Sequence, residues 1–84
     1  MKATLKLFAT LSRFLPAEAQ RTSRVEVDLG PGTTVQGLID RYRIPPDLCA
    51  LVLVNGLFVD QAERAARILA ENDTVAIWPP VGGG

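Results

Sequence analysis

The residues with the clearest chemical use form the carboxyl end of the chain, Pro79-Pro80-Val81-Gly82-Gly83-Gly84. Glycines have no Cβ atom, so Gly82 to Gly84 can lie extended in a channel too narrow for any side chain, and prolines hold the preceding segment extended. At roughly 3.3 to 3.6 Å per residue, the run from Pro79 to Gly84 reaches about 20 Å. It ends in one α-carboxylate. We therefore predict a tail that threads into an enzyme acting on the Gly84 carboxylate.

The same glycines contribute little to a folded core, because glycine loses more backbone entropy on ordering than any other residue. We expect residues 1–78 to form the folded domain and residues 79–84 to form a flexible, extended tail. The alternative is a frayed chain end without a role, since chain ends are often disordered.

Few other residues could carry catalysis. The chain has one cysteine, Cys49, and no histidine, which excludes a disulfide framework, a Cys/His zinc site and any Ser/His or Cys/His catalytic pair. Cys49 lies in an apolar run, where a free cysteine usually behaves as a small buried hydrophobe. Asp47 and Asp60 have no charged cluster beside them and are interpreted as turn residues. The chain is poorly equipped to be an enzyme alone, and we expect no metal and no bound cofactor.

Composition narrows the class of protein further. Nine basic and nine acidic residues cancel, so no net field favours nucleic acid or anionic lipid. With 84 residues and 48% hydrophobic content, the chain fits one small globular domain. The longest apolar stretch, residues 48–54, is far shorter than the roughly 20 residues that span a bilayer, and residues 1–15 lack a signal-peptide pattern. We expect a soluble cytoplasmic protein that binds neither nucleic acid nor membrane.

Alternating apolar residues predict the strands. The chain turns tightly at Asn55-Gly56, the strongest hairpin signal in the sequence, because both central residues of a type I′ turn need a positive φ. Strands are expected over residues 3–9, 25–29, 51–54, 57–59 and 75–78.

One helix is predicted over residues 33–43. Its apolar residues follow the spacing i, i+3, i+4 and i+7, and Thr33 with Gln36 fits a capping box. The helix must stop near Arg43, because Ile44 precedes Pro45 and is pushed out of the α region. The apolar residues expected to face the sheet are Val35, Leu38, Ile39 and Tyr42.

These elements predict an α+β fold in which one helix packs across one face of a mixed sheet of about five strands. If the last strand lies parallel to the first, the architecture is a β-grasp, as in ubiquitin. The alternation then points Phe8 and Trp78 away from the core, and adjacent parallel strands bring the two rings together. Paired aromatics on a surface indicate a partner interface, although Trp78 could instead cover a helix end.

The sequence also resembles the MoaD/ThiS family of sulfur carriers over essentially its whole length. Its most specific part, Pro79-Pro80-Val81-x-Gly83-Gly84, is more like the small subunit of molybdopterin synthase than like the thiamine carrier. Two positions depart from the family, which often has Arg at the place of Ser12 and Gly at the place of Asn72. The other residues that carry the resemblance are Phe8-Ala9, Thr34-Val35-x-x-Leu38, Val54-Asn55-Gly56 and Leu69 through Asp73-x-Val75.

The resemblance implies a mechanism shared with partner proteins. A ubiquitin-activating-type enzyme, similar to MoeB or ThiF, would convert the Gly84 carboxylate to an acyl-adenylate with ATP. Sulfide from a persulfide donor would displace AMP, and the Gly84 thiocarboxylate would enter a MoaE-like large subunit of molybdopterin synthase, where it donates sulfur to the pterin precursor. The catalytic residues would belong to the partners.

Three other functions stay open on the sequence. The same activated glycine could join the chain to lysines as a protein modifier. The sulfur could go to thiamine or to another cofactor, such as a tungsten pterin. The chain could also be a passive interaction domain, for which loss of the glycines would leave every function intact.

Overall fold

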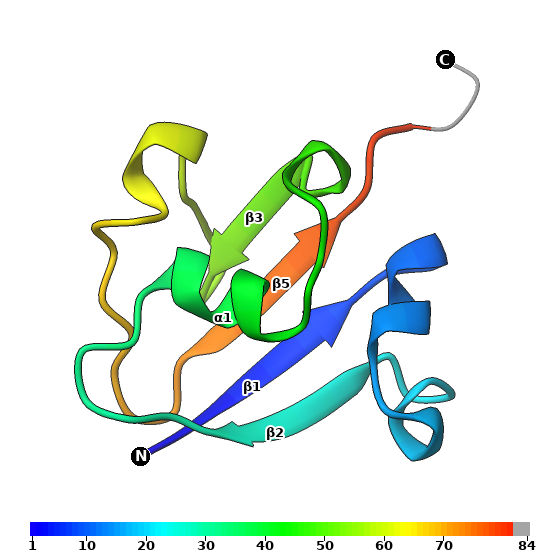
Figure 1. Cartoon of the computed structure of the whole chain (residues 1–84), viewed down its shortest axis with the longest axis horizontal. Coiled ribbons are helices and arrows are strands. Elements are labelled where there is room, and N and C mark those ends of the chain that lie inside the picture. The colour runs from blue at the N-terminus through cyan, green and yellow to red at the C-terminus, as the bar shows by residue number, and fades with distance from the viewer. Residues whose placement is uncertain (82–84) are drawn as a thin grey trace.

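The computed structural model describes residues 1–81, and they form a five-stranded mixed sheet with one main helix. The strands are β1 (Lys2–Leu7), β2 (Arg24–Asp28), β3 (Leu51–Val54), β4 (Leu57–Phe58) and β5 (Thr74–Trp78). Their order across the sheet is β2-β1-β5-β3-β4, with β1 and β5 parallel in the middle and the other pairs antiparallel (Figure 1). This is the predicted α+β, β-grasp architecture.

The core follows from the alternation of the two central strands. Leu5 pairs with Val75, and Leu7 pairs with Ile77, in the parallel register of β1 and β5. All four side chains are fully buried. Because successive strand residues point to opposite faces, the two strands place one continuous apolar face toward the helix.

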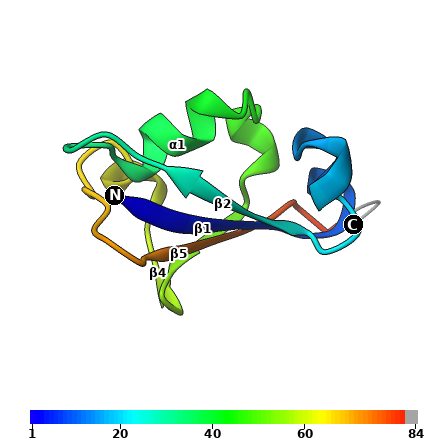
Figure 2. The same ribbon diagram turned by 90° about the horizontal axis from the view of Figure 1, so that it is seen from below.

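The helix α1 (Val35–Arg41) covers that face of the sheet (Figure 2). Val35, Leu38 and Ile39 are at most 1% exposed, as the spacing predicted, whereas Tyr42 is half-buried at the end of the helix. The packing of this apolar stripe, more than helix propensity, stabilises a helix of only seven residues.

The start of α1 corrects the sequence analysis by one residue. Thr34, and not Thr33, caps the helix, because its Oγ1 accepts the N–H of Gly37 at 3.0 Å. Thr33 is engaged in the preceding turn, where its hydroxyl donates to the carbonyl of Gly30. The predicted capping box is therefore wrong, and the side chain of Gln36 donates instead to Asp40.

Two further N–H groups of α1 are capped by a distant segment. The N–H of Val35 donates to the carbonyl of Arg67, and the N–H of Gln36 donates to the carbonyl of Arg64, each at 2.9 Å. The first N–H groups of a helix have no partner within the helix, so these bonds satisfy donors that would otherwise be orphaned. The connector after β4 thereby fixes the position of α1.

The helix ends in a Schellman motif. The N–H of Arg43 donates to the carbonyl of Asp40 at 3.0 Å, and the N–H of Ile44 donates to the carbonyl of Ile39 at 3.2 Å. Arg43 has a φ of 57°, a left-handed conformation that usually belongs to glycine. Ile44 is buried beside the core, and Pro45 prevents any continuation of the helix.

The hairpin after β3 has the predicted turn, with φ of 52° at Asn55 and 83° at Gly56. The side-chain amide of Asn55 makes two hydrogen bonds: its Nδ2 donates to the carboxylate of Asp73 at 2.8 Å, and its Oδ1 accepts the N–H of Thr74 at 2.9 Å. Asn72, where the family often has glycine, has a φ of 67°. Asparagine tolerates this region better than most residues, which explains the departure.

The first predicted strand is too long by two residues, because β1 ends at Leu7 and Ala9 has a φ of 52°. Short 3-10 helices follow at Ala9–Phe14 and Ala17–Ala19, and others lie at Pro46–Leu48 and Gln61–Glu63. Among residues 1–81, no helix is long and apolar enough to cross a membrane.

Candidate functional site

The predicted tail begins at the end of β5, the strand that lies between β1 and β3. Trp78 pairs with Leu51, and its carbonyl accepts the N–H of Ala50 at 3.0 Å. Beyond it, Pro79 is half-buried, Pro80 is exposed and Val81 is 89% exposed. The tail therefore leaves the folded domain within these three residues (Figure 1). The predicted residues Gly82, Gly83 and Gly84 lie outside the described part of the chain.

Phe8 and Trp78 meet at the root of the tail. Their rings stack with centroids 4.2 Å apart and planes inclined by 5°. The N–H of Phe8 donates to the carbonyl of Ile77 at 3.1 Å, which extends the β1–β5 pairing to this point. Both rings are half-buried and not fully exposed, because each covers one face of the other. The structure thus brings these two predicted residues together beside the point where the tail departs.

The two rings belong to a larger apolar area on the face of the sheet opposite α1. Figure 2 shows α1 on one side of the sheet and the hairpin that carries β4 projecting from the other. In the register of the sheet, Leu51 lies beside Trp78, and Leu53 lies between Ala76 and Phe58. Leu51 is 38% exposed and Phe58 is 58% exposed. We call this area the outer apolar surface, made of Phe8, Leu51, Leu53, Phe58, Ala76 and Trp78.

The β3 and β4 members of this surface were not predicted from the sequence. Their signal is present, since Val52 and Val54 face the core and the alternation then turns Leu51 and Leu53 outward. An exposed cluster of large apolar residues on a small domain usually marks a protein interaction site. The outer apolar surface is therefore the best candidate for a docking face.

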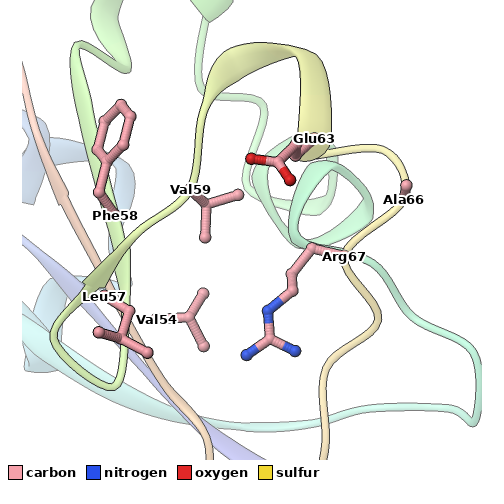
Figure 3. A pocket seen from close by; sticks show the side chains of 7 residues that line it. All are labelled: Val54, Leu57, Phe58, Val59, Glu63, Ala66 and Arg67. Atoms are coloured by element: carbon pink, nitrogen blue, oxygen red, sulfur yellow. The ribbon is translucent and has the colours of Figure 1, made fainter.

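A second feature lies along the free edge of β4. A cavity of about 470 Å³ separates this strand from residues 61–67. Figure 3 shows Leu57 and Val54 on one side and the side chains of Glu63 and Arg67 on the other. Its lining residues include no nucleophile paired with a base, so we assign no chemistry to this cavity.

Cys49 does not have the environment of a sulfur-bearing nucleophile. Its side chain is 4% exposed, and its thiol lies 3.7 Å from the carbonyl of Pro45, to which it can donate. Burial raises the pKa of the Cys49 thiol, against the opposing charge of Arg64, and the carboxylate of Asp47 raises it further. The thiol therefore stays protonated at neutral pH, as expected for a buried hydrophobe.

Arg64 is the one site residue for which the sequence carries no signal. It follows the 3-10 helix Gln61–Glu63 and is 4% exposed. Its Nη1 donates to the carbonyl of Cys49 at 3.0 Å, whereas its Nε is buried and has no hydrogen-bond partner among residues 1–81. Arginine is almost never fully buried unless it is paired, so this position is unusual.

These features together define a ubiquitin-like domain: a β-grasp sheet, an uncovered apolar face and a carboxyl-terminal segment that leaves from a central strand. The ThiS family model matches residues 5–84, nearly the whole chain. The chain belongs to the ThiS family.

Solved structures share this fold. SAMP1 from Haloferax volcanii is 26% identical, with a TM-score of 0.68 and 100% of both chains covered. A putative molybdopterin converting factor, subunit 1, from Pyrococcus furiosus is 23% identical, with a TM-score of 0.68, 95% of this chain covered and 98% of that one.

A complex of subunits 1 and 2 of the molybdopterin-converting factor from Helicobacter pylori also matches. The matched chain is 15% identical, with a TM-score of 0.60 and 100% of both chains covered. A search of curated proteins found no significant match.

Proposed function

We propose that this chain is a sulfur carrier whose Gly84 carboxylate is adenylated and then converted to a thiocarboxylate, as small subunit of molybdopterin synthase. The observation that carries the proposal is the match to the ThiS family, which extends through the tail to Gly84. The root of the tail lies beside the outer apolar surface, so one partner can hold the domain and receive the tail together.

The chemistry needs an activating partner, because a carboxylate has no good leaving group. An adenylating enzyme similar to MoeB or ThiF consumes ATP: a Gly84 oxygen attacks the α-phosphorus, and pyrophosphate leaves. The terminal sulfur of a persulfide donor then attacks the acyl carbon and AMP leaves, which gives an acyl disulfide. A second thiol attacks the donor sulfur of this S–S bond, so that a disulfide forms, the Gly84 thiocarboxylate is released and one oxygen of Gly84 is replaced by sulfur. The chain itself binds no cofactor in this scheme and supplies the extended tail.

The second partner is a large subunit similar to MoaE, which takes the thiocarboxylate and passes its sulfur to the pterin precursor. Support for a two-subunit arrangement comes from the Helicobacter pylori complex, whose matched chain shares the fold. We propose that Phe8 and Trp78 dock against both partners, with Pro79, Pro80, Val81, Gly82 and Gly83 threading into their channels. Such partners would meet this chain in the cytoplasm.

A second function is conjugation of the activated Gly84 to lysines of other proteins. The specific observation in its favour is the 26% identity over the full length to SAMP1, a small archaeal modifier protein. Both functions begin with the same adenylate and diverge at the nucleophile that displaces AMP, which is a persulfide sulfur in one case and a lysine amine in the other.

The test is incubation of the chain with its activating enzyme, ATP and a sulfide source, followed by intact-mass measurement. We expect one oxygen replaced by sulfur on the intact chain. A chain without Gly84 should not react, because chain length fixes the position of the carboxylate. Gly83→Val should be nearly as defective, since a branched side chain would collide with a narrow channel. Sulfur uptake by the chain lacking Gly84, or none by the intact chain, would overturn the proposal.

Lysine-linked adducts in cell extract, without any thiocarboxylate, would favour the modifier instead.

A further inference from the structure

Arg64 is a buried cation held in place from two directions. Its carbonyl accepts the N–H of Gln36 at the start of α1, and its Nη1 donates to the carbonyl of Cys49 just before β3. The side chain is 4% exposed. Arg64 is therefore anchored to the start of α1 by its backbone and to the segment before β3 by its guanidinium, and water screens the buried charge poorly.

This cation forms no ion pair within residues 1–81. The single ion pair within that range joins Lys2 and Asp28 on the surface, at 3.5 Å. The buried Nε of Arg64 has no acceptor, and within the same range its Nη2 donates no hydrogen bond either. An unpaired buried charge costs several kcal/mol in a folded protein, so an arrangement of this kind suits a site that an anion completes.

Arg64 lines a cavity of about 550 Å³ between the turn at residues 46–50 and the segment 58–64. Asp47 and Asp60 also line the cavity, but both residues are exposed, so solvent and salt weaken their effect on an entering anion. Solvent and salt screen the charge of the buried guanidinium much less. Anion attraction in the cavity is thus concentrated at Arg64.

The cavity adjoins the surface expected to face a partner. Phe58 lines it and also belongs to the outer apolar surface. Ala50, another lining residue, donates its N–H to Trp78 at the root of the tail. A polypeptide that covers the outer apolar surface around Phe58 therefore reaches the mouth of the cavity.

We propose that this cavity is a carboxylate-binding subsite, in which Arg64 receives an Asp or Glu side chain of the partner docked on the outer apolar surface. A guanidinium forms charge-assisted hydrogen bonds to a carboxylate, and the Nη2 of Arg64, which donates no hydrogen bond within residues 1–81, is the group available for one. A phosphate dianion fits less well, because Asp47 and Asp60 repel its second charge. The choice of a protein as the source of the carboxylate rests on the proposed function.

The first test uses the free protein and needs no partner. Sodium acetate is titrated into ¹⁵N-labelled protein at constant ionic strength, with sodium chloride as the reference and inorganic phosphate as a third arm, while the Arg64 Nε–H resonance is followed by NMR. We expect a saturable shift of this resonance with acetate, because Nε belongs to the same guanidinium group as the Nη2 that binds the anion, and none with chloride. No saturable shift with acetate, or tighter binding of phosphate than of acetate, would overturn the carboxylate subsite.

The second test compares Arg64→Met with Arg67→Met in binding to the activating enzyme by calorimetry. The backbone carbonyl of each arginine accepts an N–H of α1, and these substitutions keep that bond, but Arg67 is exposed and lines the other cavity. Arg64→Met should weaken binding by at least about tenfold, since losing one member of a buried charge pair is costly. Arg67→Met should bind like the parent chain.

Equal binding by Arg64→Met and the parent chain would refute the partner carboxylate. Urea unfolding is measured alongside, and if Arg64→Met does not fold, the acetate titration of the parent chain decides. If the chain takes up no sulfur but still shows the acetate shift, the proposed function is refuted and the carboxylate-binding subsite is supported.

Discussion

Replacing Arg43 with glycine should stabilise the protein, although glycine inside a helix usually destabilises it. Arg43 has a φ of 57° at the end of α1, and the two Schellman hydrogen bonds, at 3.0 and 3.2 Å, hold it there. An L-residue pays about 1 to 2 kcal/mol for this left-handed conformation, which glycine adopts without steric cost. Glycine also loses about 0.5 to 1 kcal/mol more in backbone entropy on folding. The net gain in the free energy of unfolding should be about 0.5 to 1 kcal/mol.

The side chain of Arg43 does not complicate the comparison, since it is exposed and donates no side-chain hydrogen bond within residues 1–81. Arg43→Ala is the matched control, because it removes the same side chain but keeps the strained conformation. Urea unfolding can be followed by the fluorescence of Trp78, the chain's one tryptophan. Arg43→Ala should lie within about 0.5 kcal/mol of the parent, as surface substitutions usually do. An Arg43→Gly variant less stable than Arg43→Ala would refute this account of the helix end.

Three other changes test the core, the polar network and the docking face. Leu38→Ala should lower the free energy of unfolding in urea by roughly 2 to 5 kcal/mol, because the side chain is fully buried. A loss under about half a kcal/mol would show that α1 does not pack in the core. Burial alone would raise the pKa of Asp73, but the Ala70 N–H, the Asn55 amide and the Arg67 charge together lower it. The stability that this carboxylate provides is therefore complete above its unfolded pKa of roughly 3.9 and is lost as the pH falls through the lower folded value. In Asp73→Asn, the free energy of unfolding should depend less on pH below about pH 4 than in the parent chain. An unchanged pH dependence would contradict the role of this hydrogen-bond network. Trp78→Ala should weaken binding to the proposed large-subunit partner by at least about 1 kcal/mol in calorimetry, and it should cost about 0.5 to 1.5 kcal/mol of stability through the lost ring stack. A stability loss that exceeds the binding loss would favour a structural role for Trp78.

The sheet and its helix could be predicted because they rest on local periodicity. The alternation of Leu5 and Leu7 and the helical spacing of Val35 and Leu38 each report which face is buried. The Asn55-Gly56 turn is equally local, since its two residue types suit the positive φ that the hairpin needs. Features of this kind need no knowledge of the rest of the chain.

The helix cap and Arg64 could not be predicted, because both depend on distant contacts. Thr33 and Thr34 are equally good caps by residue type, and the hydrogen bond from Thr33 to Gly30 decides between them. Arg64 stands in a polar, alanine-rich run that is typical of a surface connector. Its burial follows from two tertiary hydrogen bonds, to Gln36 and Cys49, which no local pattern encodes.

If the chain is the proposed carrier, the energetics of its tail explain why it would need a docking face. Ordering a backbone residue costs about 1 to 2 kcal/mol, so threading Pro79 to Gly84 into a channel costs on the order of 6 to 12 kcal/mol before any contact is counted. At about 25 cal/mol per Å² of buried apolar surface, offsetting that cost takes roughly 240 to 480 Å². The three glycines have no side chain to bury, so within the tail only Pro79, Pro80 and Val81 offer apolar area, and we expect much of this stabilisation to come from the outer apolar surface. A chain that ends at Trp78 should therefore bind the large subunit with an affinity much closer to that of the parent chain than Trp78→Ala does, when both are measured by calorimetry. If the shortened chain lost binding while Trp78→Ala kept it, the tail would be the anchor and the docking face would have no energetic role.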